Sequence, residues 1–577
     1  METFNIWLVA GVLVGLVGTL IFTRLKPLYA FAGALLILYF SGLLPKEQLL
    51  LNFVNESVIS LLLLLLTSLA LEKTRFVQQM ANLLLKGKER FVLFKMMTSA
   101  GLLSSVTNNT AVVATLIDPI QRNPKIPPSR LLIPLSYATI LGGVLTLVGT
   151  STNLIIDGLA RKEGLPGLGF FDFTLVGLPI FFIGVLLLTL TYKLLPNNGV
   201  QAPKAASNYF TELKVLADSP LVRQTVEEAG LKAIDGLYLV ELIRGDELII
   251  PVKPSQRLRE GDRLVFSGDV NQVYKLEAMP GLELDDDLSN LLERNLVEVV
   301  LSPTSTLINK GVRHSSFHSQ FDATVVAVKR GNQHLSGGWE AFTLRSGDVL
   351  ILAVGPEFQN RPNLGRNFVV VIGLPTVNQY EGYKAVLVAG GFFVALMAAA
   401  TGVLNLLDSL LILLMLYLAT GVLTATEIRR RAPFELILII GCALGIAQVM
   451  LSSGLATTLA NQIVTVFAYW GVWGALVGIY LITWLTTELI TNNASAALSF
   501  PISLAIAQQF GVDPKPLLIT TAFAASASFL SPYGYQTNLM VYSPGKYRYL
   551  DYVRAGLPLS IVYGIAVCAL VPWFFPF

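Results

Sequence analysis

Thr107-Asn108-Asn109 and Thr491-Asn492-Asn493 are two short polar tripeptides that interrupt long apolar stretches of the sequence. The flanking apolar arms are residues 91–106 and 111–117 for the first tripeptide, and residues 473–490 and 494–506 for the second. Neither interruption is long enough to form a loop that reaches water. Non-helical backbone at membrane depth is tolerated only where it is buried in protein or lines a cavity. The pattern therefore predicts two helical hairpins that enter the membrane part-way, with the tripeptides at their tips.

The composition indicates a membrane protein. The chain has 577 residues, of which 53% are hydrophobic and only 14% are charged, and its mean hydropathy is +0.63. These values are far more apolar than those of an average globular domain. The formal net charge of +3 is too small to indicate a nucleic-acid partner, so we expect none.

The apolar stretches follow the same order in the two halves of the chain. Stretches long enough for a hydrocarbon core of about 30 Å are residues 6–22, 28–44, 57–71, the first hairpin, 131–160 and 174–195, and then 384–404, 409–426, 434–451, the second hairpin, 516–543 and 555–575. We expect the stretch 131–160 to be broken at Gly149–Asn153, and the stretch 516–543 to be broken at Ser531–Asn538.

Residue motifs repeat with the stretches. Thr107-Asn108-Asn109 precedes Thr152-Asn153-Leu154 by 45 positions, and Thr491-Asn492-Asn493 precedes Thr537-Asn538-Leu539 by 46. A paired motif at nearly the same spacing indicates an internal repeat. Each half would cross the membrane five times, and an odd number of crossings predicts that the second half is inverted relative to the first. Most lysines and arginines in the loops then fall on the side of the polar middle region, which predicts that this region is cytoplasmic and that both termini are outside.

The polar middle region contains a tandem repeat with a period of 86 residues. Residues 258–264 recur as residues 344–350, and Arg244-Gly245 recurs as Arg330-Gly331. Short β-runs separated by turn signals predict two small α+β modules. Arg244 and Arg330, each before a glycine, are candidates to bind a small anionic ligand, although solvated turn arginines are the alternative. The predicted domains are residues 1–199, 200–290, 291–375 and 376–577.

These residues resemble two known families. The hairpin tips, the Gly-Thr-x-x-Asn break at Gly149–Asn153 and the repeat resemble the divalent-anion/sodium symporter family, within a superfamily that includes citrate and arsenite carriers. The tandem resembles the ligand-binding module of potassium-uptake regulators (TrkA-C or RCK-C), which some sulfate-transporter-like members carry. The family's tip motif is Ser-Asn-Thr, and its first copy could fall on Thr107–Asn109 or on Asn108–Thr110. The resemblance implies an α-helical polytopic protein with two inverted repeats, each with a re-entrant hairpin and a broken helix.

The resemblance also implies which residues bind ions. Helix N-termini at the tips favour anions, while unpaired carbonyls at helix ends suit Na⁺. The expected substrate-binding residues are Thr107, Asn108, Asn109, Thr110, Thr491, Asn492 and Asn493. The expected cation-binding residues are Asn109, Gly149, Thr152, Asn153, Asn493, Gly534, Thr537 and Asn538.

The expected function is Na⁺-coupled import of a divalent anion, sulfate first, and the resemblance implies an elevator-type movement and a homodimer in the plasma membrane. No enzymatic activity and no cofactor are expected apart from Na⁺ as the coupling ion, and the modules would bind an unknown small ligand. One alternative is a dicarboxylate/sodium symporter. Another is a Na⁺/H⁺ antiporter, which would use Glu488, one helical turn before Asn492, or Asp118 as its proton carrier. A ligand-gated channel is a third alternative.

Overall fold

The 577-residue chain is represented by a computed structural model. It describes every residue except 1, 24, 26, 73–83, 86, 122, 124, 199–209, 232, 235–236, 246, 250–251, 269–278, 285–295, 303–304, 312–316, 331–332, 336–342, 355–357, 359–360, 362–363, 373–379, 381 and 433. The domain boundaries expected at residues 199, 290 and 375 lie outside the described residues.

The first half of the chain is helical. Its elements are α1 (Glu2–Phe22), α2 (Pro27–Phe40), α3 (Lys46–Leu51), α4 (Glu56–Glu72), α6 (Glu89–Ser104), α7 (Asn109–Gln121), α8 (Pro128–Gly143), α9 (Ser151–Lys162), α10 (Asp172–Leu190) and η1 (Tyr192–Leu194). Helices α6 and α7 coincide with the expected hairpin arms, because apolar residues surround a polar tripeptide that interrupts the helix. Helices α8 and α9 coincide with the expected broken span.

The second half of the chain is also helical, and its described helices follow a similar order. They are α15 (Tyr383–Ala400), α16 (Leu406–Ala419), α17 (Ala425–Arg431), α18 (Phe434–Ser452), α19 (Leu455–Val466), η7 (Ala468–Trp470), α20 (Gly471–Leu489), α21 (Asn492–Phe510), α22 (Lys515–Ser526), α23 (Gln536–Tyr542) and α24 (Tyr549–Phe574). Helix α19 was not predicted, because polar residues divide its apolar ones. It is amphipathic, and it buries Leu455, Ala456, Ala460 and Ile463 on one face.

Contacts between the halves are reciprocal. Helix α4 packs on α16 while α18, its counterpart in the second half, packs on α2. In the same way α9 packs on α21, and α23 packs on α7. Helices α10 and α24, which end the two halves, contact each other. Helices at matching places in the order of the two halves therefore have matching partners.

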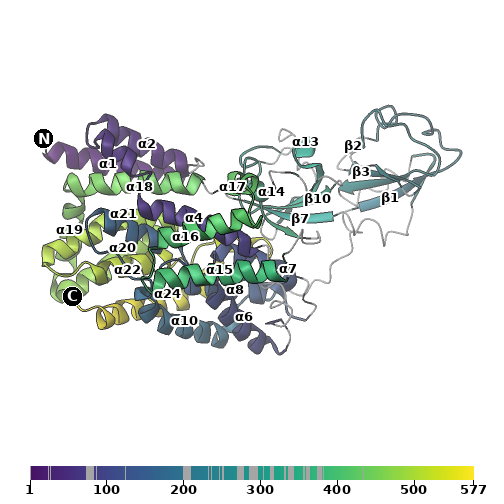
Figure 1. Ribbon diagram of the computed structural model, residues 1–577. Coiled ribbons are helices and arrows are strands. Elements are labelled where there is room, and N and C mark those ends of the chain that lie inside the picture. The colour runs from purple at the N-terminus through teal and green to yellow at the C-terminus, as the bar shows by residue number, and fades with distance from the viewer. Residues whose placement is uncertain are drawn as a thin grey trace.

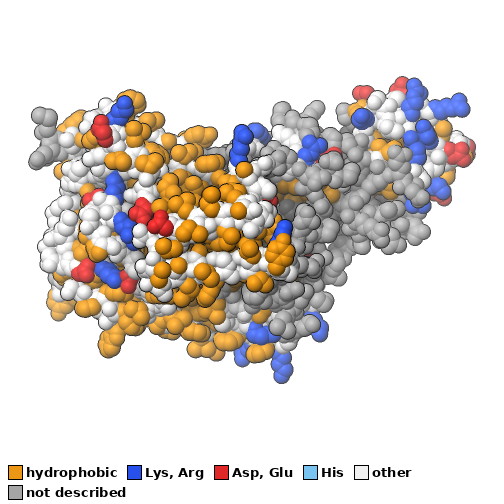
Figure 2. Space-filling view, viewed as in Figure 1, with side chains coloured by type: hydrophobic (Ala, Val, Ile, Leu, Met, Phe, Trp, Pro, Cys, Tyr) orange, Lys and Arg blue, Asp and Glu red, His pale blue; other side chains and the backbone are white. Residues whose placement is uncertain are grey.

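Several helices could cross a membrane. Among the described residues, six are long and apolar enough by length and composition: Phe4–Phe22 of α1, then α10, α15, α18, α20 and α24. Helices α2, α16 and α19 and residues Val58–Leu71 of α4 are apolar but shorter. The chain is therefore mostly helical with several candidate membrane spans, and this part of the predicted fold class is confirmed. Hydrophobic side chains cover much of the visible surface of the helices (Figure 2).

Two antiparallel sheets lie between the helical halves in sequence. The first has the strand order β2-β3-β5-β1-β6, with β4 paired to β3, and the second has the order β11-β7-β10-β8-β9. The first contains β1 (Phe210–Val215), β2 (Ala233–Ile234), β3 (Leu237–Arg244), β4 (Glu247–Ile249), β5 (Arg263–Gly268) and β6 (Leu282–Leu284). The second contains β7 (Leu296–Leu301), β8 (Ala323–Arg330), β9 (Gln333–Leu335), β10 (Val349–Val354) and β11 (Phe368–Ile372), with α13 (Phe317–Phe321) and α14 (Leu364–Asn367).

The strand registers of the two sheets agree with the repeat of 86 residues. Leu264 of β5 lies between Leu213 and Leu242 on the neighbouring strands. Leu350 of β10 lies between Val299 and Val328, each 86 positions later. We call the β1–β6 unit the first module and the β7–β11 unit the second module.

The modules project from one end of the helical body (Figure 1). The second module lies against the helices, whereas strands β1 and β3 of the first module lie farther away. Both chain termini lie at the opposite end of the helical body. In Figure 2 charged side chains gather on the visible surface of the first module.

Candidate functional site

Each polar tripeptide lies where one helix ends and the next begins. Helix α6 ends at Ser104 and α7 begins at Asn109, while α20 ends at Leu489 and α21 begins at Asn492. The Asn108 side chain accepts a hydrogen bond from the N–H of Thr110 at 3.0 Å. The Thr491 hydroxyl accepts one from the N–H of Ala494 at 3.4 Å. These contacts fix the first turns of α7 and α21, whose remaining N–H groups form anion-attracting helix ends.

Each tip asparagine contacts the broken helix of the other half. Asn109 Nδ2 donates to the Tyr535 hydroxyl at 2.8 Å, directly before α23. Asn493 Oδ1 accepts a hydrogen bond from Ser151 at 2.7 Å, at the start of α9. Asn109 is buried, and its Oδ1 also accepts from Ser104 at 2.6 Å. The fold thus brings Asn109 and Asn493 to the same layer of the molecule as the two breaks.

The breaks lie slightly earlier than expected. They cover residues 144–150 and 527–535, and Thr152, Asn153, Thr537 and Asn538 lie in the first turns of α9 and α23. The physical reason is that Thr and Asn are small polar residues that are tolerated in the first turn of a helix, so α9 and α23 can begin before these pairs. Thr150 and Tyr535 directly precede α9 and α23, and their hydroxyls are 3.1 Å apart.

Gly149 and Gly534 occupy equivalent tight positions. A Cβ on Gly149 would lie 2.4 Å from the Gly143 carbonyl oxygen and 2.9 Å from that of Ser105. A Cβ on Gly534 would lie 2.3 Å from the Ser528 hydroxyl and 2.6 Å from the Thr487 carbonyl oxygen. Each glycine therefore lets a break approach the carbonyl end of its hairpin's first arm.

Asn153 and Asn538 have the same structural role. Asn153 Nδ2 donates to the Thr146 carbonyl at 2.9 Å, and Asn538 Nδ2 donates to the Ser531 carbonyl, also seven residues earlier, at 3.1 Å. Both amides thus hold the unwound segment against the new helix. Asn153 Oδ1 is buried and has no hydrogen-bond partner among the described residues.

Hydroxyl groups complete the layer around these amides. Thr152 shares a hydrogen bond with Ser526 at 2.7 Å, and Ser136 donates to Asn538 Oδ1 at 2.7 Å and to Thr537 at 2.9 Å. All five residues are essentially excluded from solvent. Oxygen atoms of amides, hydroxyls and carbonyls are ligands for hard cations, as the chemistry of calcium and magnesium sites illustrates.

The Glu488 carboxylate binds the second break. Its Oε1 accepts hydrogen bonds from the N–H groups of Phe529 and Leu530, each at 2.8 Å, and its Oε2 accepts from Ser528 at 3.4 Å. Within the described part of the chain no lysine or arginine forms an ion pair with it. Glu488 therefore stabilises unwound backbone, and it places a carboxylate close to the site.

Other expected residues lie apart from the centre of the site. Thr107 donates its hydroxyl to the carbonyl of Leu103 at 2.7 Å, within its own arm. Asp118 lies nine residues beyond Asn109 in α7, about 13 Å along the helix axis. Thr110 and Asn492 lie in the first turns of α7 and α21 and are partly exposed.

Arg244 and Arg330 bind aspartates within their own modules. Arg244 makes two hydrogen bonds to Asp262, both 2.8 Å, and Arg330 makes two to Asp348, both 2.7 Å. Both aspartates are buried, so the charge of each guanidinium is already neutralised. The hydrogen bonds that Arg330 donates to Asp348, together with the negative charge of that carboxylate, raise the pKa of Arg330 above its ordinary value. The fold uses both arginines to close a turn, so these contacts give no support to the hypothesis that they bind an anionic ligand.

Sequence reasoning missed several residues of the site. Tyr535 and Thr150 link the two halves, Ser151 binds a tip amide, and Ser104, Ser136 and Ser526 donate or share hydrogen bonds. The repeat alignment itself pairs Thr150 with Tyr535, because each lies two positions before a matching Thr-Asn-Leu motif. That alignment could have identified them, whereas the serines carried no such signal.

The assembled site has many neutral donors and acceptors and little charge. Neither tripeptide and neither break contains a lysine or an arginine. An anion here would be held by amide, hydroxyl and backbone N–H groups and by the ends of α7 and α21. Its charge would need a mobile cation nearby, because an isolated charge is costly to bury.

Comparison with known proteins identifies a family of transporters. Residues 16–511 match the family described as citrate transporter. A putative sulfur deprivation response regulator of Chlamydomonas reinhardtii is 33% identical over 568 residues, which cover 94% of this chain and 97% of that protein. An uncharacterized transporter of Synechocystis sp. is 29% identical over 566 residues, 93% of this chain and 91% of that protein. Sodium/sulfate cotransporter 1 of C. reinhardtii is 29% identical over 371 residues, 62% of this chain and 42% of that protein.

Proposed function

The chain belongs to the citrate transporter family, and from that premise we propose that it is a Na⁺-coupled symporter that imports a divalent oxyanion, sulfate first. Relatives of similar sequence are named sodium/sulfate cotransporters. Membership in a family of transporters agrees with the expectation that the chain is not an enzyme. Sulfate is preferred because the site offers small neutral hydrogen-bonding groups and no arginine that could pair with the carboxylates of a larger substrate.

The contacts between each tip and the opposite break support this function most strongly. Asn109 contacts Tyr535 and Asn493 contacts Ser151, so the two halves meet at one place through groups that can also bind an oxyanion. A ligand that displaces Tyr535 and Ser151 from these amides would change how α23 and α9 are held. In this proposal the substrate-binding residues are those expected in both tips, with Asn109 and Asn493 at the centre and Thr107, Thr110 and Asn492 at its edge, joined by Tyr535 and Ser151.

We propose that Na⁺ binds between each tip and the neighbouring break. The Asn153 Oδ1 atom is a buried acceptor without a hydrogen-bond donor among the described residues, which is the condition a cation relieves. Gly149 and Gly534 bring the breaks against carbonyl oxygens at the ends of α6 and α20. Bound Na⁺ would offset the charge of the anion, which explains why the two would be transported together.

The membrane arrangement belongs to the same proposal. The repeated order of helices and their reciprocal contacts support two inverted repeats, each with a re-entrant hairpin and a broken helix. The termini and the modules lie at opposite ends of the helical body, which agrees with outward termini and cytoplasmic modules in the plasma membrane (Figure 1). An elevator-type movement in a homodimer, and TrkA-C-like modules within the domain boundaries given above, complete the proposal.

The test is uptake of radiolabelled sulfate into proteoliposomes that contain the purified protein, with and without an inward Na⁺ gradient. We expect uptake that requires the gradient and that excess sulfate abolishes. Competition by succinate, phosphate and arsenite at equal concentration ranks the substrates. Stronger competition by succinate than by sulfate would replace this proposal with a dicarboxylate symporter.

A further inference from the structure

The two modules contain the same turn, but among the described residues the copy in the second module is the one that touches the helical body. In each, an arginine holds an aspartate that closes the turn, and the same aspartate accepts a backbone N–H at 2.8 Å, from Arg259 or from Arg345. Gly261 and Gly347 occupy the same place and have nearly equal positive φ angles, 77° and 80°. The turns therefore differ in what lies beside them and not in their own geometry.

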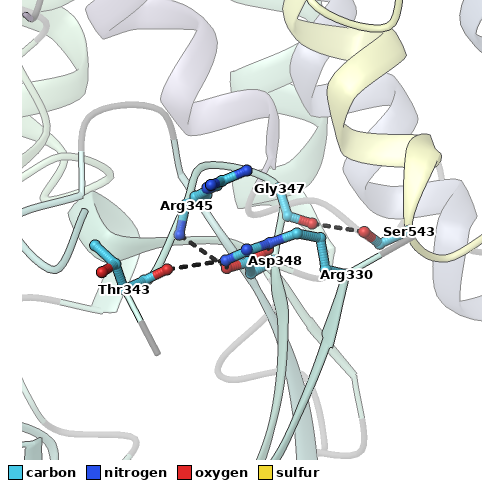
Figure 3. A network of polar contacts seen from close by, with 6 residues as sticks. All are labelled: Arg330, Thr343, Arg345, Gly347, Asp348 and Ser543. Atoms are coloured by element: carbon cyan, nitrogen blue, oxygen red, sulfur yellow. Dashed lines mark hydrogen bonds and ion pairs between the residues drawn. The ribbon is translucent and has the colours of Figure 1, made fainter. Parts of the chain in front are cut away.

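The turn of the second module lies directly against the end of α23. The Ser543 hydroxyl donates a hydrogen bond to the Gly347 carbonyl at 2.7 Å, as Figure 3 shows. A Cβ on Gly347 would lie 2.9 Å from Leu539 Cδ1, so the side chain of Leu539 in α23 packs on the glycine itself. Around Gly261, by contrast, nothing lies within 4 Å of that position.

Further contacts show that the second module meets the helical body over a surface and not through a single hydrogen bond. Val300 of β7 and Val349 of β10 are buried in the same apolar cluster as the membrane helices. Strand β11 contacts α7, the second arm of the first hairpin. The second module thus touches both α7, which begins with Asn109, and α23, whose first turn contains Thr537 and Asn538.

We infer that the second module is docked through the Arg345–Asp348 turn onto α23 and acts as a brake that slows movement of this helix, whereas no described atom packs on Gly261 in the matching turn of the first module. This inference rests on the proposed function, because a brake presumes that α23 moves during transport. The Arg330–Asp348 pair is the positioning element, since it holds the turn in the shape that meets Ser543 and Leu539 (Figure 3).

The chain offers a matched pair of variants. Asparagine tolerates positive φ better than most residues, so Gly347→Asn and Gly261→Asn carry the same modest backbone cost. Of the two, only Gly347→Asn places a side chain against Leu539. Ser543→Ala removes the hydrogen bond from the other side of the contact and leaves the turn itself intact.

Two measurements on the full-length protein test the inference. We expect the rate of hydrogen exchange at the amides of residues 536–547 to rise by about threefold or more in Gly347→Asn. The rise should be smaller in Ser543→Ala, and Gly261→Asn should exchange at the rate of the unaltered protein. We expect the maximal rate of sulfate uptake to rise by a similar factor with an unaltered KM. Equal exchange in Gly347→Asn and Gly261→Asn, or a maximal rate that falls, would overturn the inference. If the unaltered protein does not transport sulfate, the proposed function fails, while hydrogen exchange still decides whether the docked turn holds α23.

Discussion

Asn109 and Asn493 lie at matching places in the two halves, but their amides have different partners. Asn109 uses both ends of its amide, since Ser104 donates to it and it donates to Tyr535. Both partners have a second contact, because Ser104 also donates to the Thr139 carbonyl and Tyr535 also contacts Thr150. Loss of the Asn109 amide would therefore leave neither hydroxyl without a partner.

Asn109→Ala and Asn493→Ala should each abolish sulfate uptake while stability changes by about 1 kcal/mol or less. The reason is that each variant loses a ligand-binding amide but little core volume, and that the neighbours of Asn109 keep alternative partners. Uptake and thermal unfolding are measured on the same preparations. Asn461→Ala, at an exposed amide on α19, is the control and should behave like the unaltered protein. Retained uptake in both tip variants would contradict the site.

Some residues of the site could be predicted from the sequence and others could not. Polar tripeptides inside apolar stretches identified both tips, because polar groups at membrane depth are costly unless they have hydrogen-bond partners or bind a ligand. The role of Tyr535 could not be predicted, because its contact with Asn109 joins positions 426 residues apart in the sequence and forms only when the two halves pack together. The Arg244–Asp262 and Arg330–Asp348 pairs could have been found, since each joins residues 18 positions apart within a repeated motif.

The broken helices are the elements that bring the site together. Their unwound segments are stabilised from several directions: Asn153 and Asn538 bind carbonyls of the breaks, and Glu488 binds two N–H groups of the second break. Glu488 therefore has a structural role in the second break, and the antiporter alternative that would use it as a proton carrier stays a prediction. Asp118 lies too far along α7 to serve the tips directly.

Gly149→Ala and Gly534→Ala should each impair transport strongly and raise the Na⁺ concentration needed for half-maximal uptake. A methyl group there would push each break away from the carbonyls of Ser105 and Thr487. The measurement is uptake as a function of Na⁺ concentration. Gly33→Ala is the matched control, because a Cβ on this helical glycine of α2 meets nothing within 4 Å.

A shift in the sulfate KM with an unchanged Na⁺ requirement in both break variants would contradict the assignment of cation binding to the breaks.

The exact ends of the broken helices could not be predicted from the sequence. Sequence spacing located the Thr-Asn pairs, but it could not determine whether they end a break or begin a helix, because that depends on which carbonyls lie nearby.

At the scale of the whole molecule, the modules interrupt the chain between its two helical halves. Every proposed contact with the substrate lies outside them, and the second module meets the helices at α7 and α23. The sequence predicted the tandem and its period, and the registers of β5 and β10 agree with it. It could not predict which module would dock, because the two turns are nearly identical in sequence and shape.

Deletion of residues 205–372, with the halves rejoined by a flexible linker, should leave a folded transporter with an altered maximal rate. The sulfate KM and the competition profile against succinate and phosphate should match those of the full chain, because the tips and breaks are retained. Uptake kinetics of the two proteins side by side provide the comparison. A changed order of preference among the anions would mean that the modules help to form the substrate site.

The dependence of sulfate uptake on Na⁺ concentration tests the central claim most directly. Because the site supplies no positive side chain for a divalent anion, more than one Na⁺ should accompany each sulfate, and uptake into proteoliposomes should rise sigmoidally with Na⁺. Replacement of Na⁺ by choline should reduce uptake to the level of empty liposomes. Uptake that persists in choline, or that a pH gradient drives equally well, would contradict Na⁺-coupled transport at this site.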